Sequence, residues 1–288
     1  MTAPAPSASA PASRGGAASD GAPSAPLFPS FDGVTPVAPP PLAPAPAVRI
    51  ENVGKRFGDG PVVLDDITLD IAPGEFVCLL GASGCGKSTL LNLIAGLERP
   101  TTGRIETPAE GSAVMFQESA LMPWLTARRN VELALRLRGV PRGERRERAM
   151  TLLDTVNLAD AAEKRPHELS GGMRQRVALA RALAQDRPVL LMDEPFAALD
   201  AITRDLLHEE LERVWRATGR TIVFVTHNVR EAARLGQRVI LLTSRPGRVG
   251  GEWRIAQTAG RRIESPEVAA LSIEITDQLR KEIRRNAL

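Results

Sequence analysis

One nine-residue segment limits the fold of this chain more than any other. Residues 81–89 read Gly-Ala-Ser-Gly-Cys-Gly-Lys-Ser-Thr, which fits the pattern G-x-x-x-x-G-K-[ST] in full. The segment follows an apolar run at 75–80, typical of a buried strand, and precedes an apolar helical stretch at 90–97. A strand, a glycine-rich turn and a helix in this order predict a loop that wraps a polyphosphate.

The residue types in this loop suit that task. Glycines at Gly81, Gly84 and Gly86 leave room for backbone N–H groups to reach phosphate oxygens. Lys87 supplies a positive charge for the β- and γ-phosphates, and Ser88 offers a hydroxyl to Mg²⁺. The other loop residues expected to line the phosphates are Ala82, Ser83, Cys85 and Thr89. The loop alone predicts a nucleotide hydrolase or a kinase and does not choose between them.

Short apolar runs recur after the loop and alternate with helical stretches. They lie at 113–116, 189–192, 221–225 and 239–242. Solid apolar runs of this length are typical of parallel strands that are buried on both faces of a sheet. We therefore predict an α/β fold, a P-loop NTPase core built on a parallel sheet.

Two other regions have different patterns. Residues 48–51 and 62–71 alternate between apolar and polar, as half-buried strands do, and they predict an antiparallel β subdomain. From about 118 to 185 no solid apolar run occurs, and stretches such as 131–137 and 143–156 have helical character. We therefore expect a helical subdomain inserted into the core, which itself extends over 48–249.

The two ends of the chain differ from this core. Residues 1–47 are rich in Ala, Pro, Ser and Gly and hold more than half of the 23 prolines, which predicts a disordered tail, or alternatively a tail that docks on a partner. Residues 250–288 form a C-terminal extension, in which Ser265 and Pro266 predict the start of a helix. Its apolar face would contain Val268, Leu271, Ile275, Leu279 and Ile283. This helix is expected to pack on the body of the protein, with dimerisation as the alternative.

Two carboxylates end the apolar run at 189–192. Asp193 is placed to hold Mg²⁺, directly or through water. Glu194 would point in a different direction and could polarise an attacking water. A solvated strand end is the simpler interpretation of this pair when it is taken alone.

A second anion-binding device lies in Leu-Ser-Gly-Gly-Met-Arg-Gln-Arg at 169–176. Ser170, Gly171 and Gly172 open a helix, and a helix N-terminus with a hydroxyl and two glycines attracts phosphate. An ordinary serine N-cap is the alternative. A chain with two phosphate-binding devices and one magnesium site suggests that the second device serves a neighbouring subunit.

The phosphate loop, the serine-glycine-glycine segment and the Asp-Glu pair, in this order and spacing, resemble the ATP-binding subunits of ABC transporters. The resemblance covers residues 48–249 and implies ATP and Mg²⁺ as ligands. It implies that Gln117 senses Mg²⁺ and contacts a permease, that Asp200 lies in a loop crossing a dimer, and that His227 contacts the γ-phosphate. It also implies that the ring of Phe57 stacks on adenine, in a chain without tyrosine.

The resemblance further implies an assembly. Two identical subunits would sandwich two ATP molecules, each between the 81–89 loop of one chain and residues 170–172 of the other. The homodimer would lie on the cytoplasmic face of the inner membrane beneath an integral permease, which an extracytoplasmic solute-binding protein serves. Met173 and Asn228 depart from the commonest family pattern, at positions that do not carry the essential chemistry.

Two further segments indicate a branch of the family. Residues 120–126, Ala-Leu-Met-Pro-Trp-Leu-Thr, and 244–249, Ser-Arg-Pro-Gly-Arg-Val, resemble importers of nitrate, taurine and aliphatic sulfonates. Plain packing and an ordinary turn are the alternatives. A transporter of another solute and a soluble ABC ATPase of DNA repair or translation also remain open, although the long coiled-coil or zinc insertions usual in the latter are not found here.

Charge and hydropathy exclude other classes. The net charge of +3 is too small to indicate nucleic acid, and the arginines within 142–148 alternate with Glu144 and Glu147, as on a solvated helix face. We therefore expect no nucleic-acid partner. No apolar run approaches the ~18 residues of a membrane span. Two cysteines, Cys78 and Cys85, are too few for a disulfide framework.

Overall fold

The computed structural model describes residues 45–255 and 261–286. The sequence predicts a disordered tail at 1–47, and residues 1–44 of this tail lie outside the described part of the chain. Ala47, which the sequence assigned to that tail, is buried and donates its backbone N–H to the carbonyl of Ile71 at 2.8 Å. The packed region therefore begins at or before this residue.

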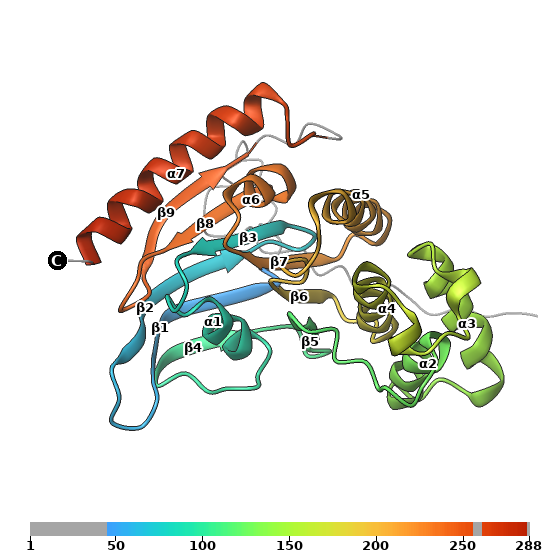
Figure 1. Cartoon of the computed structure of the whole chain (residues 1–288). Helices are drawn as coiled ribbons and strands as arrows, with labels where there is room; N and C mark the ends of the chain where they lie inside the picture. The colour runs from blue at the N-terminus through green and yellow to red at the C-terminus, as the bar shows by residue number, and fades with distance from the viewer. Residues whose placement is uncertain (1–44, 256–260, 287–288) are drawn as a thin grey trace, which may run out of the picture. The chain divides into compact units, whose positions relative to one another are not determined.

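A six-stranded sheet forms the centre of the molecule (Figure 1), in the order β5–β6–β7–β3–β8–β9. Neighbouring strands are parallel except at one edge, where β9 runs antiparallel to β8. The strands are β3 (Phe76–Gly81), β5 (Ser112–Met115), β6 (Val189–Asp193), β7 (Thr221–Thr226), β8 (Arg238–Leu242) and β9 (Val249–Arg254). The predicted parallel sheet is confirmed.

Both faces of this sheet are covered. Along β3, Phe76, Cys78 and Leu80 belong to one buried apolar cluster, which includes residues of the helices α2 to α7. Val77 and Leu79 point into a second cluster, shared with α1 (Lys87–Ile94) and the smaller sheet. Because successive side chains of a strand point to opposite faces, two covered faces require a solid apolar run, which is the pattern that the sequence shows.

The smaller sheet is antiparallel, in the order β2–β1–β4. Its strands are β1 (Val48–Arg56), β2 (Val62–Ile71) and β4 (Thr102–Glu106). Val48 pairs with Ile71 and Arg56 with Val62, so β1 and β2 form a hairpin. The antiparallel β subdomain is thereby confirmed, with β4 added to the two strands that the sequence predicted.

Helices fill the chain between β5 and β6. They are α2 (Ala127–Leu137), α3 (Arg142–Thr155) and α4 (Gly171–Ala184), with two single turns of 3₁₀ helix at Ala159–Ala161 and Pro166–Glu168. Figure 1 shows α2, α3 and α4 together, to one side of the six-stranded sheet. Thr126 caps α2 by accepting the N–H of Arg129, which explains why the helix begins before the predicted residue 131.

Three more helices complete the fold: α5 (Ala201–Thr218), α6 (Val229–Leu235) and α7 (Pro266–Asn286). The predicted C-terminal helix is confirmed as α7, and Ser265 Oγ accepts the N–H of Val268 at 3.4 Å. Val268 and Ile275 are buried as expected, whereas Ile283 is 47% exposed and its neighbour Glu282, which lies close to Gly250 of β9, takes the buried position. No helix in the described ranges is both long and apolar enough to cross a bilayer.

Candidate active site at the phosphate loop

The 81–89 loop joins β3 to α1 and depends on glycine at one position in particular. Gly86 caps α1 with a φ of 99°. A Cβ at this residue would lie 2.6 Å from Leu64 Cδ2, so both the backbone conformation and the packing exclude a side chain. The loop therefore packs closely against Leu64 of β2.

Lys87 lies inside the loop. Its ammonium donates hydrogen bonds to the carbonyl oxygens of Gly81 at 2.9 Å and Ala82 at 3.1 Å. The Nζ atom also lies 4.0 Å from Oε1 of Glu194, the residue directly after β6. The loop lysine and the carboxylate that the sequence predicted to act on water are thus neighbours.

Asp193 and Ser88 face each other at the end of β6. Burial raises the pKa of Asp193, the hydrogen bond with Ser88 opposes that rise, and the charge of Glu194 reinforces it. A hydroxyl and a carboxylate are hard oxygen donors, the kind that Mg²⁺ uses together with phosphate oxygens and water. The pair fits the predicted magnesium site.

Glu194 occupies a strained position. Its φ is 44°, in the left-handed region, which costs a residue with a side chain about 1–3 kcal/mol. Its N–H donates to the carbonyl of Val225 at 3.0 Å, and its Oε2 lies 2.8 Å from His227 Nδ1. The carboxyl ends of parallel strands meet at one sheet edge, so β3, β6 and β7 bring Lys87, Glu194 and His227 together.

Sequence reasoning missed the charged groups behind this pair. Glu231 and Arg204 line a small cavity of about 30 Å³ together with Glu194 and His227. Glu231 accepts a hydrogen bond from Thr226 Oγ1 at 2.6 Å and lies 3.4 Å from Arg204 Nε. The only hint in the sequence is that Glu231 follows His227 by four residues.

Ser170 and Asp200 sit at the starts of two neighbouring helices. Ser170 Oγ accepts the N–H of Met173 at 3.3 Å and caps α4, while Asp200 accepts the N–H of Thr203 at 2.9 Å and caps α5. A Cβ on Gly172 would lie 2.5 Å from Thr203 Cγ2, so the two helix starts approach closely. Throughout 45–255 and 261–286, no hydrogen bond or ion pair joins these residues to the phosphate loop, and Figure 1 shows α1 and α4 well apart.

Within the described ranges, the last two predicted residues likewise form no hydrogen bond or ion pair with the loop. Gln117 is exposed, and its carbonyl accepts a hydrogen bond from Gln175 Nε2 of α4 at 2.9 Å. It lines a surface cavity of about 650 Å³ together with Gly171. Phe57 is 48% exposed, and Lys55 Nζ lies 4.5 Å from its ring centroid.

A glycine-rich loop around a lysine, a strand ending in Asp-Glu and a histidine on the next strand define a P-loop nucleotide hydrolase. The family model described as ABC transporter matches residues 64–197. The chain belongs to the ABC transporter family of ATP-binding proteins, and it is an ATPase of that family.

Relatives and solved structures support this assignment. An aliphatic sulfonates import ATP-binding protein of Mesorhizobium japonicum is 45% identical over 83% of this chain and 94% of its own length. A taurine import ATP-binding protein of Roseobacter denitrificans is 45% identical over 72% of this chain and 82% of its own. An ATP-binding cassette solved as a post-hydrolysis dimer with ADP and Pi is 35% identical, with a TM-score of 0.63, over 73% of this chain and 100% of that one.

Proposed function

We propose that this chain is the ATP-hydrolysing subunit of an importer for taurine, aliphatic sulfonates or nitrate. The observation that carries the chemical part is the contact between Glu194 Oε2 and His227 Nδ1, next to Lys87. The names of the relatives support taurine and aliphatic sulfonates as the class of solute. Nitrate rests on the sequence resemblance alone.

Each residue of the loop region has a proposed role. The backbone of 81–89 wraps the phosphates of ATP, and Lys87 turns from the Gly81 and Ala82 carbonyls to the β- and γ-phosphates. Ser88 and Asp193, with Gln117, would hold Mg²⁺, which neutralises charge on the phosphates. Glu194 polarises the attacking water, and His227 orients Glu194 and approaches the γ-phosphate.

The remaining site residues are proposed to serve a second copy of the chain. Ser170, Gly171, Gly172 and Asp200 lie at two adjoining helix starts, which among the described residues form no hydrogen bond or ion pair with the loop of their own chain. A helix N-terminus with free N–H groups suits the γ-phosphate of an ATP bound to the partner. The exposed ring of Phe57 would stack on adenine.

The segment after Gln117 is proposed to dock on a permease at the cytoplasmic face of the inner membrane. Trp124 is 67% exposed there, which is unusual for so large an apolar side chain. Arg181 of α4 donates to the carbonyls of Ser119 at 2.8 Å and Ala120 at 2.6 Å. Because α4 begins at Ser170, one rigid helix links the proposed ATP contact to the proposed docking segment.

Replacement of Glu194 by Gln tests the hydrolytic site. The amide cannot accept a proton from water, so the rate of ATP hydrolysis should fall at least about 100-fold, while ATP binding is kept. ATPase rate and ATP affinity would be measured on the same preparation. The matched control is Glu147→Gln on the exposed face of α3, which should hydrolyse ATP as the wild type does. Unchanged turnover in Glu194→Gln would reject the role of Glu194.

Isolation from native membranes tests the transport part. The tagged chain, purified in mild detergent, should bring a multi-span permease with it, identified by mass spectrometry. Copurification with ribosomes or DNA-repair proteins would instead support a soluble ABC ATPase. That outcome would leave the ATP chemistry intact, because the chemistry is measured separately.

A further inference from the structure

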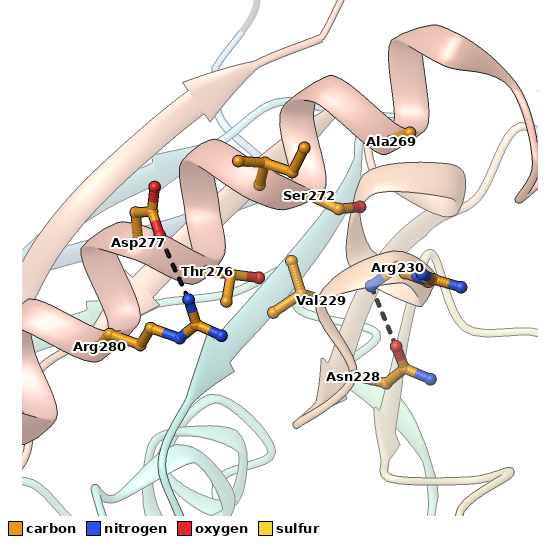
Figure 2. A pocket seen from close by; sticks show the side chains of 9 residues that line it. Asn228, Val229, Arg230, Ala269, Ser272, Thr276, Asp277 and Arg280 are labelled. Carbon is orange, nitrogen blue, oxygen red and sulfur yellow. Dashed lines mark hydrogen bonds and ion pairs between the residues drawn. The ribbon is translucent and has the colours of Figure 1, made fainter.

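A groove between α6 and α7 lies outside the nucleotide site. Figure 2 shows it from close by, and its volume is about 380 Å³. The residues that line it are Asn228, Val229, Arg230, Ala269, Ser272, Ile273, Thr276, Asp277 and Arg280. One wall begins at Asn228, the residue directly after His227, and the other wall is the C-terminal helix.

The α7 wall presents a polar stripe. Ser272, Thr276 and Arg280 are spaced by four residues, so they lie above one another on one face of the helix. This stripe begins at the edge of the apolar face, on which Ile275 packs into the core, and Ser272 at that edge is itself buried. In Figure 2 the side chains of Ser272, Thr276 and Arg280 extend from α7 on the side that faces Val229.

Ser272 provides the observation that suggests a ligand. Its exposed fraction is only 8%, yet its Oγ has no hydrogen-bond partner among the described residues. A hydroxyl that is buried without a partner costs stability, and native structures rarely leave one so. Ser272 is one of the residues that line the groove, so a group bound against it could accept this hydrogen bond after a small shift of the side chain.

The charges on the groove favour an anion. Two arginines, Arg230 and Arg280, are among its lining residues, together with one carboxylate residue, Asp277. Asp277 lies 3.6 Å from Arg280, a separation that leaves most guanidinium N–H groups of Arg280 free to donate. Arg230 extends from the opposite wall, away from Arg280 (Figure 2), and adds positive potential on the α6 side of the groove.

We propose that this groove binds a small oxyanion with a sulfonate, sulfate or phosphate group. The Arg280 guanidinium and the Thr276 and Ser272 hydroxyls donate hydrogen bonds to its oxygens. A short hydrocarbon attached to the anion would pack against the apolar side chains of Val229 and Ile273. The site is separate from the ATP site, so it goes beyond the proposed ATPase function and does not depend on it.

Calorimetric titration of the full chain tests the proposal. Because the phosphate loop also attracts oxyanions, every titration is made in a Lys87→Ala background, at constant ionic strength set with chloride. The probes are ethanesulfonate, sulfate and phosphate, and we expect saturable binding of at least one. Binding of ethanesulfonate alone would identify an organic sulfonate as the ligand class, and binding of the inorganic ions an inorganic oxyanion.

Three variants locate the binding. Arg280→Gln should weaken the affinity at least tenfold, because it removes the charged donor. Asp277→Asn should tighten binding, because it removes the one carboxylate of the groove. The matched control is Arg284→Gln, an exposed arginine one turn further along α7 and outside the groove, which should leave the affinity unchanged.

The opposite expectations for Arg280 and Asp277 separate binding from a loss of structure. A damaged helix would weaken binding in both variants, and with Lys87 intact Arg280→Gln should keep its basal ATPase rate. The absence of saturable binding for all three probes would overturn the proposal. Binding that Arg280→Gln leaves unchanged would overturn it equally.

Discussion

At the scale of single residues, the site depends on how Glu194 and His227 are held. The strained φ of Glu194 persists because its N–H is bonded to Val225 and its carboxylate to His227. Behind them, Thr226 donates to Glu231, and the buried ring of His208 lies 3.6 Å from the same carboxylate. Glu194 and His227 are therefore held next to ionisable side chains that are themselves buried.

Glu231 should make stability depend on pH in acid. Burial opposes its ionisation, but the hydrogen bond from Thr226 and the neighbouring side chains of His208 and Arg204 outweigh burial and lower the pKa of Glu231 below its usual value. A lowered carboxyl pKa contributes stability that is present above the unfolded-state pKa and is lost as pH falls through the folded-state pKa. Glu231→Gln should thus be less stable than the wild type at neutral pH, with a difference that shrinks below about pH 4.5.

Urea unfolding from about pH 6 to about pH 3 would measure this difference. Glu147→Gln, at an exposed carboxylate that forms no ion pair within the described residues, serves as the control and should follow the wild-type curve. A difference between Glu231→Gln and wild type that stays constant over the whole range would contradict the assignment.

The residues predicted from the sequence are those that a local pattern defines. The 81–89 loop and the Asp193–Glu194 pair are contiguous with the strands that place them, so spacing was sufficient. Arg204 and Glu231 come from two helices that meet only in the folded chain, behind a residue of β7. A periodic pattern within either helix does not show that the two helices contact each other in the folded chain.

At the scale of helices and strands, α7 should contribute to stability through one face only. Ile275 is fully buried in the main apolar cluster, and Ile275→Ala should cost about 2–5 kcal/mol of unfolding free energy. Ile273, two residues earlier, is 64% exposed, and Ile273→Ala should change stability by no more than about 0.5 kcal/mol. Thermal or urea unfolding of both variants checks this pair. Equal losses would mean that α7 is not docked as described.

The strands that sequence reasoning missed are those without a doubly buried pattern. β4 is mostly exposed, and β9 contains two glycines and pairs at one edge only. Neither produces the apolar run or the alternation by which strands such as β3 and β7 are recognised. The apolar pattern also misplaced the last buried position of α7, because the charged residue Glu282 is buried there and the apolar residue Ile283 is exposed.

At the scale of the whole molecule, the proposed shared site predicts complementation. Lys87→Ala damages the phosphate loop and Ser170→Arg fills the helix start, so each variant alone should be inactive. A mixed dimer has one site with both halves intact, and mixing the two proteins should restore part of the ATPase rate. The controls are Lys87→Ala alone and Ser170→Arg alone at the same total concentration, which should both stay inactive. Full activity of Ser170→Arg alone would show that each chain completes its own site.

The separation of the Lys87 loop from the Ser170 helix start has a consequence for concentration. If each site needs parts from two molecules, ATP hydrolysis in dilute solution follows second-order rather than first-order dependence on the chain. Halving the number of copies would then cost more than half of the activity. A permease that holds two copies side by side would remove that penalty by raising their local concentration, so idle subunits away from the membrane would consume little ATP.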